Sequence, residues 1–265
     1  MVGIVPMVPI VAIVPIVTIK KQENKHMLKG LIFDYGGTLD TNGLHWAEVL
    51  WRQYEAIGLP VSKADFREAY VHGERTMGRQ PLVHPTDDFR QVLVIKSRLQ
   101  LQFLADKGVL DTDAWPIETY AGRIADGGYQ VARAVTQSAR KVIQRLKTKY
   151  KLVLVSNFYG NIRTILEDFN LLCFFEEVVE SSVVGVRKPD PAIFALGVEA
   201  LGLPPEQVAV VGDSYTKDIL PAHSLGCRTV WLKGIGWEPE EHDETLPSAV
   251  IGSLEEVTEV VEGLL

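Results

Sequence analysis

Cysteine is scarce in this sequence, with two residues, Cys173 and Cys227, among 265. Two cysteines exclude the disulfide framework on which many small secreted domains depend. Both lie in apolar runs of the sequence. We therefore expect two buried free thiols in a protein of a reducing compartment.

Basic residues are too few for a chain-wide nucleic-acid-binding surface. The chain has 27 Lys and Arg against 34 Asp and Glu, a formal net charge of −7. Non-specific DNA binders need an excess of positive charge to contact phosphates. Hydrophobic residues make up 46% of the chain and charged residues 23%, which is ordinary for a globular protein and sufficient for a core.

The longest stretch without charge is at the beginning of the chain, over residues 1–19. Three prolines interrupt it, and each would break a membrane-spanning helix. No basic segment precedes it and no small-residue cleavage site follows it. We expect residues 1–26 to be an extension outside the fold, which begins near Met27; a membrane-associating tail or an added edge strand are the alternatives. The expected location is the cytoplasm.

Short apolar runs bounded by turn residues recur after Met27 and are typical of buried strands. They cover residues 28–34, 151–157, 176–184, 207–213 and 228–234. Helical patterns lie between or after them, at 138–150, 161–169, 191–202 and 253–265. Strands that alternate with helices predict an α/β fold built on a parallel sheet.

One long segment, residues 41–135, departs from this alternation and shows helical patterns alone. These cover residues 45–58, 63–74, 88–108 and 117–135. We expect an all-helical domain inserted after the first strand. The α/β core would then consist of residues 28–40 and 136–265.

Residues that can bind ligands or take part in a reaction follow the predicted strands, at the edge where parallel sheets bind their ligands. They are Asp34, Gly36, Gly37 and Thr38 after the first strand, Ser156 and Asn157 at the second, Lys188 after the third, and Asp213 and Asp218 after the fourth. Crowded carboxylates repel one another and favour a hard cation such as Mg²⁺. A lysine, a hydroxyl and turn amides can balance the charge of a phosphoryl group. The pattern predicts phosphoryl transfer to a carboxylate.

Four segments in this order resemble the motifs of the haloacid dehalogenase (HAD) superfamily, and the match covers residues 28–234. They are FDYGGTLD (33–40), LVSN (154–157), RKPDP around Lys188, and VVGDSYTKD (210–218). The resemblance implies a Rossmann-like core. It also implies that the inserted helices form the water-excluding cap of the helical-cap (C1), phosphatase-like branch.

The resemblance implies a role for each residue at the strand ends. Asp34 would be the nucleophile, and Lys188 would hold phosphoryl oxygens with Ser156. Asn157, Thr38 and Gly37 would complete the substrate-binding side. Mg²⁺ would be held by Asp34, by Asp213 and by the backbone carbonyl of Gly36, with Asp218 orienting or completing the shell.

The sequence departs from the family pattern D-x-D-x-T at Gly36, where the second Asp is missing. That residue would be the general acid, a group whose loss typically costs about 10²–10⁴ in rate. We expect a Mg²⁺-dependent hydrolase, a phosphatase of a small phosphorylated metabolite, with neither nucleic acid nor membrane as partner. The alternative is a weakened member that binds a phosphorylated ligand or regulates a partner. Substrate identity and oligomeric state stay open.

Two other branches of the superfamily tolerate a non-acid at this position and are less favoured. A dehalogenase would use a cap arginine, for which Arg67 is available. Its pocket binds an anion without a metal ion, and the carboxylate of Asp213 would be unfavourable there. A phosphonatase would use a cap lysine, and Lys63 lies in a polar helix start. Five residues are available to replace the missing acid, but each is more simply explained as a linker or solvated residue: Asp40, His45, His72, Glu74 and Arg75.

Overall fold

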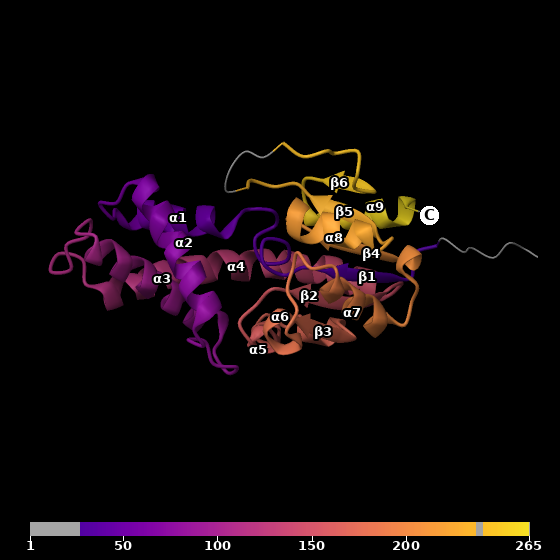
Figure 1. Ribbon diagram of the computed structural model, residues 1–265, viewed down its shortest axis with the longest axis horizontal. Helices are drawn as coiled ribbons and strands as arrows, with labels where there is room; N and C mark the ends of the chain where they lie inside the picture. Colours follow the sequence, from indigo (N-terminus) through magenta and orange to yellow (C-terminus); the bar gives the residue numbers. More distant parts are fainter. Residues whose placement is uncertain (1–26, 237–240, 265) are drawn as a thin grey trace, which may run out of the picture.

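The computed structural model describes residues 27–236 and 241–264, so the predictions for residues 1–26 lie outside the described residues. Six parallel strands form one sheet in the order β3-β2-β1-β4-β5-β6 (Figure 1). They are β1 (Gly30–Phe33), β2 (Lys151–Ser156), β3 (Glu177–Glu180), β4 (Val208–Gly212), β5 (Arg228–Leu232) and β6 (Ala249–Ile251). The predicted α/β fold with a parallel sheet is confirmed.

Alternate residues of each strand face opposite sides of the sheet. Leu31 and Phe33 join a core with helix α4 (Ile117–Lys147) and helix α9 (Val257–Gly263). Ile32 faces the other side and joins a core with helix α7 (Ala192–Leu201). Burial of each such side chain contributes about 1.5–3 kcal/mol, so the two cores hold helices on both faces.

Four helices connect β1 to β2, and we call them the helical insert. They are α1 (Trp46–Ile57), α2 (Lys63–Arg79), α3 (Phe89–Asp106) and α4. Side chains cap the first three: His45, Ser62 and Asp88 each accept a hydrogen bond from a backbone N–H of the first turn. Figure 1 shows α1, α2 and α3 beyond one end of the sheet.

Helix α4 is 31 residues long, and it joins two helices that the sequence predicts separately, at 117–135 and 138–150. Its beginning packs against α1 and α3, and it also contacts α9 beside the sheet. The predicted boundary between residues 135 and 136 therefore falls inside a continuous helix.

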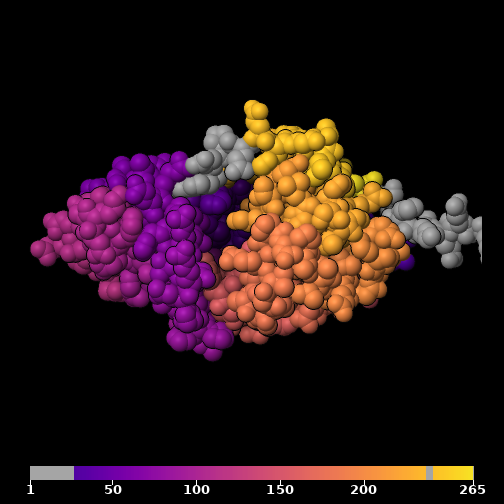
Figure 2. Space-filling view, in the orientation of Figure 1, coloured from indigo at the N-terminus to yellow at the C-terminus, as the bar shows by residue number. Residues whose placement is uncertain are grey.

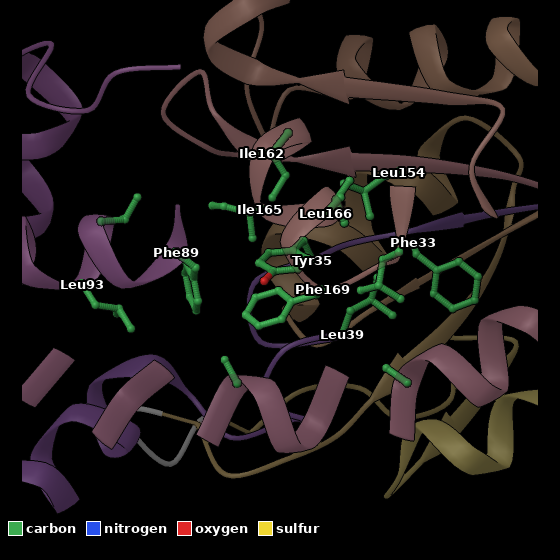
Figure 3. Close-up of a cluster of buried hydrophobic side chains, with 14 of the residues drawn as sticks. Phe33, Tyr35, Leu39, Phe89, Leu93, Leu154, Ile162, Ile165, Leu166 and Phe169 are labelled. Atoms are coloured by element: carbon green, nitrogen blue, oxygen red, sulfur yellow. The ribbon is translucent and has the colours of Figure 1, made fainter. Parts of the chain in front are cut away.

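Tyr35 anchors the segment that leaves β1. Its side chain is fully buried, and its ring meets Phe89 and Phe158 edge-on, at centroid distances of 6.1 and 5.9 Å. Figure 3 shows Tyr35 among Phe89, Phe169 and Leu39. Because Tyr35 is committed to this apolar cluster, its neighbour Asp34 is held at the edge of the sheet.

Smaller elements complete the chain. They are α5 (Ile162–Asp168), α6 (Ser181–Val184), α8 (Leu220–Ser224), and the short helical turns η1 (Leu172–Phe174), η2 (Pro205–Gln207), η3 (Tyr215–Ile219) and η4 (Leu254–Glu256). The strand predicted over 176–184 ends at Glu180, because the next four residues form α6. In the described part of the chain, no helix has both the length and the apolar character that a membrane crossing requires.

The cysteine prediction is correct for one residue and wrong for the other. Cys227 is buried, whereas Cys173 is exposed, and both are free thiols. Cys173 lies in η1, where the neighbouring residues Leu172 and Phe174 are partly buried instead. An apolar run in a short helical turn buries only one side, and Cys173 lies on the other.

Candidate functional site

The candidate site lies where the strand order reverses. Strand β1 is the first in the chain, β2 and β3 follow on one side of it, and β4 to β6 lie on the other. Asp34 directly follows β1 and Asp213 directly follows its neighbour β4, and the Asp34 N–H donates to Val211 O at 3.0 Å. This reversal opens a crevice at the carboxyl ends of the strands, where open α/β sheets bind ligands.

Lys188 joins two of the predicted carboxylates. Its Nζ donates to Asp34 Oδ1 at 2.6 Å and to Asp218 Oδ1 at 2.7 Å. All three residues are buried. Burial lowers the pKa of Lys188, but the charges of Asp218 and Asp34 outweigh it and raise the pKa overall. The ammonium therefore stays charged and fixes both carboxylates.

Asp213 lies beside this trio and is held by Thr38. Thr38 Oγ1 donates to Asp213 Oδ1 at 3.2 Å and accepts from the Asp213 N–H at 3.1 Å. Burial raises the pKa of Asp213, and the charges of Asp34 and Asp218 raise it further. One lysine thus faces three carboxylates, and the cluster is short of positive charge.

The cluster fits a hard divalent cation. One oxygen from each of Asp34, Asp213 and Asp218 lies within 4.8 Å of the others. Carboxylate oxygens are the ligands that Mg²⁺ takes from proteins, and its charge would relieve their mutual repulsion. Gly36, predicted to offer its carbonyl, lines the same cavity as these carboxylates.

Gly36 and Gly37, which follow Tyr35, differ in burial. Gly37 has φ +98° and is buried, and its N–H donates to Asp40 Oδ1 at 2.7 Å. Gly36 is exposed, and a Cβ added there would meet no atom of residues 27–236 and 241–264 within 4 Å. The position where the family pattern has its second Asp is therefore open space at the site.

Asn157 holds the backbone of Lys188. Its Oδ1 accepts from the Lys188 N–H at 2.9 Å, and its Nδ2 donates to the Lys188 carbonyl at 3.1 Å. Its amide is thus bonded to the loop that carries the lysine. Ser156, the last residue of β2, is buried and lines the cavity.

The site opens into a cavity of about 1390 Å³ between the sheet edge and the helical insert. Figure 2 shows this hollow between the indigo and purple helices and the orange α/β part. Except for Thr38, which is fully buried behind the site, the predicted site residues line it. These are Asp34, Gly36, Gly37, Ser156, Asn157, Lys188, Asp213 and Asp218.

Of the residues considered as substitutes for the missing acid, His45, Glu74 and Arg75 line the cavity, whereas Asp40 and His72 do not. His45 Nδ1 accepts from the Ala47 N–H at 3.1 Å, which places the ring proton on Nε2. Burial, followed by the positive charge of Lys217, lowers the pKa of His45 to about 4. At neutral pH His45 is therefore an uncharged hydrogen-bond donor and not a general acid.

The sequence prediction missed Lys96, a buried lysine in the cavity wall. Its Nζ pairs with Glu74 Oε1 at 2.6 Å and lies 5.9 Å from the ring centres of Tyr70 and Tyr159. Tyr159, from the α/β part, donates to Glu74 Oε2 at 3.2 Å. One signal was available, because Lys96 follows Val92 by four residues on the buried side of α3.

The residues that the less favoured branches would need lie elsewhere. Lys63 pairs with Glu48 at 2.7 Å, its side chain is 49% exposed, and it does not line the cavity. Arg67 lines a separate hollow of about 650 Å³ beside His72 and Phe103. Neither residue meets the carboxylate cluster in this arrangement.

Residues 28–226 match the family described as haloacid dehalogenase-like hydrolase. The chain is 38% identical over 104 residues to haloacid dehalogenase-like hydrolase domain-containing protein 3 of Danio rerio, covering 39% of this chain and 43% of that protein. It is 41% identical over 107 residues to a phosphoserine phosphatase of Thermus thermophilus, covering 40% and 42%. It is 34% identical over 134 residues to a glyceraldehyde 3-phosphate phosphatase of Pyrococcus furiosus, covering 47% and 53%.

These matches span only about half, or less, of the length of the curated relatives. Likeness to solved structures extends further. A dehalogenase has a TM-score of 0.61 at 19% identity, over 88% of this chain and 96% of that one. A structure described as the HAD-hydrolase YfnB of Bacillus subtilis bound to magnesium has a TM-score of 0.57 at 20% identity, over 89% and 99%. At these identities the likeness establishes the fold. Together with the family match over most of its length, it shows that the chain belongs to the haloacid dehalogenase-like hydrolases.

Proposed function

We propose that the protein is a Mg²⁺-dependent phosphatase of small phosphorylated metabolites, with Asp34 as the nucleophile. The observation that carries this proposal is the cluster of Asp34, Asp213 and Asp218 at the strand-order reversal, with Lys188 bonded to Asp34 and Asp218. Two relatives with phosphatase names support it. An abandoned site has no physical reason to keep three mutually repelling carboxylates around one lysine.

Asp34, Asp213 and the carbonyl of Gly36 would hold the metal ion, with Asp218 completing or orienting the shell. Bound Mg²⁺ would offset the negative charge of the carboxylates and of the phosphoryl oxygens. Lys188 would share in this work, since its ammonium already bonds to Asp34. Asn157 would hold the loop of Lys188 in register with the nucleophile.

The reaction would pass through an aspartyl phosphate. A carboxylate oxygen of Asp34 attacks phosphorus, the bond from phosphorus to the leaving oxygen breaks, and water later hydrolyses the acyl phosphate. Ser156, Lys188 and the amides of the Gly36–Gly37 turn would stabilise the charge on the phosphoryl oxygens. Gly36 offers no acid, so the leaving oxygen would take its proton from water or depart as a stable anion.

The helical insert would serve as the cap over this chemistry. It forms one wall of the cavity through Tyr70, Glu74 and Lys96. Excluding water from the cavity strengthens electrostatic interactions inside it and protects the acyl phosphate. Substrate would enter between the insert and the sheet edge, where Figure 2 shows the opening.

The test is phosphate release from p-nitrophenyl phosphate and acetyl phosphate, with and without Mg²⁺. We expect turnover that requires Mg²⁺ and that Asp34→Asn abolishes, because an amide is not a nucleophile towards phosphorus. The exposed residue Asp113, changed to Asn, is the matched control and should keep full activity. Capture of the acyl phosphate by hydroxylamine should succeed in the control and fail in Asp34→Asn. Turnover that survives Asp34→Asn would contradict the proposal.

Gly36 also favours a second candidate function, a weakened member that binds a phosphorylated ligand with little turnover. The test compares two measurements: the rise in melting temperature when phosphate is added with Mg²⁺, which reports ligand binding, and the hydrolysis of acetyl phosphate, which reports catalysis. If Mg²⁺ and phosphate stabilise the protein while even acetyl phosphate is not hydrolysed, the binding function holds and the phosphatase fails.

A further inference from the structure

The cavity is lined by more basic side chains than the proposed phosphoryl transfer to Asp34 requires. Its described lining holds seven Lys and Arg side chains against four Asp and Glu, in a chain whose formal net charge is −7. The basic members are Arg75, Arg79, Lys96, Arg187, Lys188, Lys217 and Lys233, and the acidic ones are Asp34, Glu74, Asp213 and Asp218. Positive charge is thus concentrated in one cleft of an acidic protein.

Ion pairs account for three of the seven cations. Lys188 bonds to Asp34 and Asp218, Lys96 pairs with Glu74, and Lys233 pairs with Glu244. The other four form what we call the basic wall: Arg75, Arg79, Arg187 and Lys217. Within residues 27–236 and 241–264, no member of the basic wall takes part in an ion pair, and all four are exposed. Their charges are free to meet a ligand.

The basic wall approaches the cavity from both sides. Arg75 and Arg79 belong to α2 of the helical insert, whereas Arg187 precedes Lys188 and Lys217 follows Asp213 in the α/β part. A phosphoryl group on Asp34 would be matched by Lys188 and the metal ion, so α2 would face the rest of the substrate.

We propose that the basic wall binds a second anionic group of the substrate, so that the enzyme prefers phosphomonoesters whose leaving group carries a carboxylate or another phosphate. This inference rests on the proposed phosphatase function. Guanidinium groups bind carboxylate and phosphate through paired hydrogen bonds. A cleft of one charge sign also concentrates oppositely charged ligands. The volume of about 1390 Å³ leaves room for such a leaving group beside the phosphoryl site.

The test compares 2-phosphoglycolate with 2-hydroxyethyl phosphate, which differ only in a carboxylate in place of CH₂OH. We expect kcat/KM in Mg²⁺ to be at least about tenfold higher for phosphoglycolate, the equivalent of one charge-assisted contact. The bisphosphate of 1,3-propanediol forms a third arm, and it shows whether the second anion is better recognised as carboxylate or as phosphate.

Variants of the basic wall test whether its side chains cause the preference for phosphoglycolate. In the triple variant Arg75→Gln, Arg187→Gln and Lys217→Gln, the ratio should fall towards one, because kcat/KM falls more for phosphoglycolate than for 2-hydroxyethyl phosphate, which has no second anionic group. Arg52, exposed on α1 and outside the cavity lining, gives the control Arg52→Gln, which should keep the wild-type ratio. A wild-type ratio near one, or a ratio that the triple variant leaves unchanged, would overturn the inference.

Failure of the phosphatase proposal can be separated from failure of this inference. If no phosphomonoester is hydrolysed, p-nitrophenyl phosphate included, the proposed function is wrong. Calorimetric titration of the same two compounds in Mg²⁺ then decides the second point. Tighter binding of phosphoglycolate that the triple variant abolishes supports the anion subsite, and equal binding of both compounds rejects it.

Discussion

Gly37 faces the carboxylate of Asp213 so closely that a Cβ on Gly37 would lie 2.3 Å from Asp213 Oδ2. The φ of +98° at Gly37 adds a second constraint, because L side chains rarely adopt it. The turn after β1 and the residue after β4 can therefore meet only through a glycine. This contact sets how closely the two strand ends bring their carboxylates together.

Gly37→Ala should damage both stability and activity. We expect the free energy of unfolding to fall by about 1–2 kcal/mol from backbone strain alone. Displacement of Asp213 should lower kcat/KM by on the order of a hundredfold. Gly226→Ala is the matched control, since Gly226 has φ +85° but the nearest described atom to its Cβ would be Pro205 Cβ at 4.0 Å. It should lose stability and keep activity. Equal activity in the two variants would show that the contact with Asp213 does not matter.

Gly36→Asp should restore the acid that the family pattern contains. Among the residues that the structure describes, no atom lies within 4 Å of the added Cβ, so the carboxyl has room at the edge of the cavity. Turnover of alkyl phosphates, whose leaving group needs a proton, should rise by about 10²–10⁴, and that of p-nitrophenyl phosphate should change little. Gly36→Asn has the same shape without the acid and should give no gain. If Asn and Asp act alike, proton donation is not what the native chain lacks.

Asn157→Ala should separate positioning from substrate binding. Both amide bonds of Asn157 go to the Lys188 backbone, so their loss should move the ammonium relative to Asp34. We expect kcat to fall by about tenfold or more while KM stays within about threefold. Steady-state kinetics with phosphoglycolate provide the measurement. A raised KM with unchanged kcat would instead favour the direct substrate contact that the family resemblance implies.

Asp40 should make stability depend on pH. Burial raises its pKa to about 7, against a usual value near 4, although hydrogen bonds from Gly37 and Trp46 oppose this. Between about pH 4 and pH 7 the unfolded chain releases this proton while the folded protein retains it. The stabilisation is therefore complete below pH 4 and disappears as pH rises through 7.

Asp40→Asn has no proton to lose at this position, so its stability relative to wild type should increase as pH rises. Urea unfolding at pH 5 and pH 8 should show this difference shift by on the order of 2 kcal/mol. Any fixed cost of the amide, such as facing the N–H of Gly37 or Trp46, is the same at both values and cancels. Parallel stability profiles would mean that Asp40 titrates normally.

The sequence was a good guide wherever the signal was local. Alternation of apolar and turn residues predicted β1, β2, β4 and β5 and the polar residues that follow them, since strand ends of a parallel sheet share one edge. It failed to predict β6, because its three residues follow a long polar segment and contribute too little pattern. Family and fold could therefore be predicted from local patterns of residues.

The helix boundaries were harder to predict than the strands. Gly127 and Gly128 lie inside α4, and Gly73 lies inside α2, although glycine is unfavourable in the interior of a helix. In the structure they are contact positions: a Cβ on Gly128 would approach Leu93 to 3.3 Å, and one on Gly73 would approach Gln100 to 3.4 Å. Close helix packing outweighs the propensity here, and no local pattern reveals it.

The contacts in the cavity wall were the hardest feature to predict from the sequence. Glu74 and Lys96 are 22 positions apart and meet only because α2 packs on α3. The same holds for Asn157 and Lys188, whose pairing depends on the loop after α6. Residue type identified them as polar, but their partners follow from tertiary packing.

The unbroken course of α4 restricts how the molecule can be rebuilt. The chain enters the insert through a short loop after β1, but it returns through a single helix that contacts both α3 and α9. A chimera that takes α1, α2, α3 and the first part of α4 from a relative, and keeps the part of α4 that contacts α9, must be spliced in mid-helix. Each residue added or lost at the splice turns everything beyond it by about 100°, so only changes near whole turns, such as seven residues, would keep the two halves in phase.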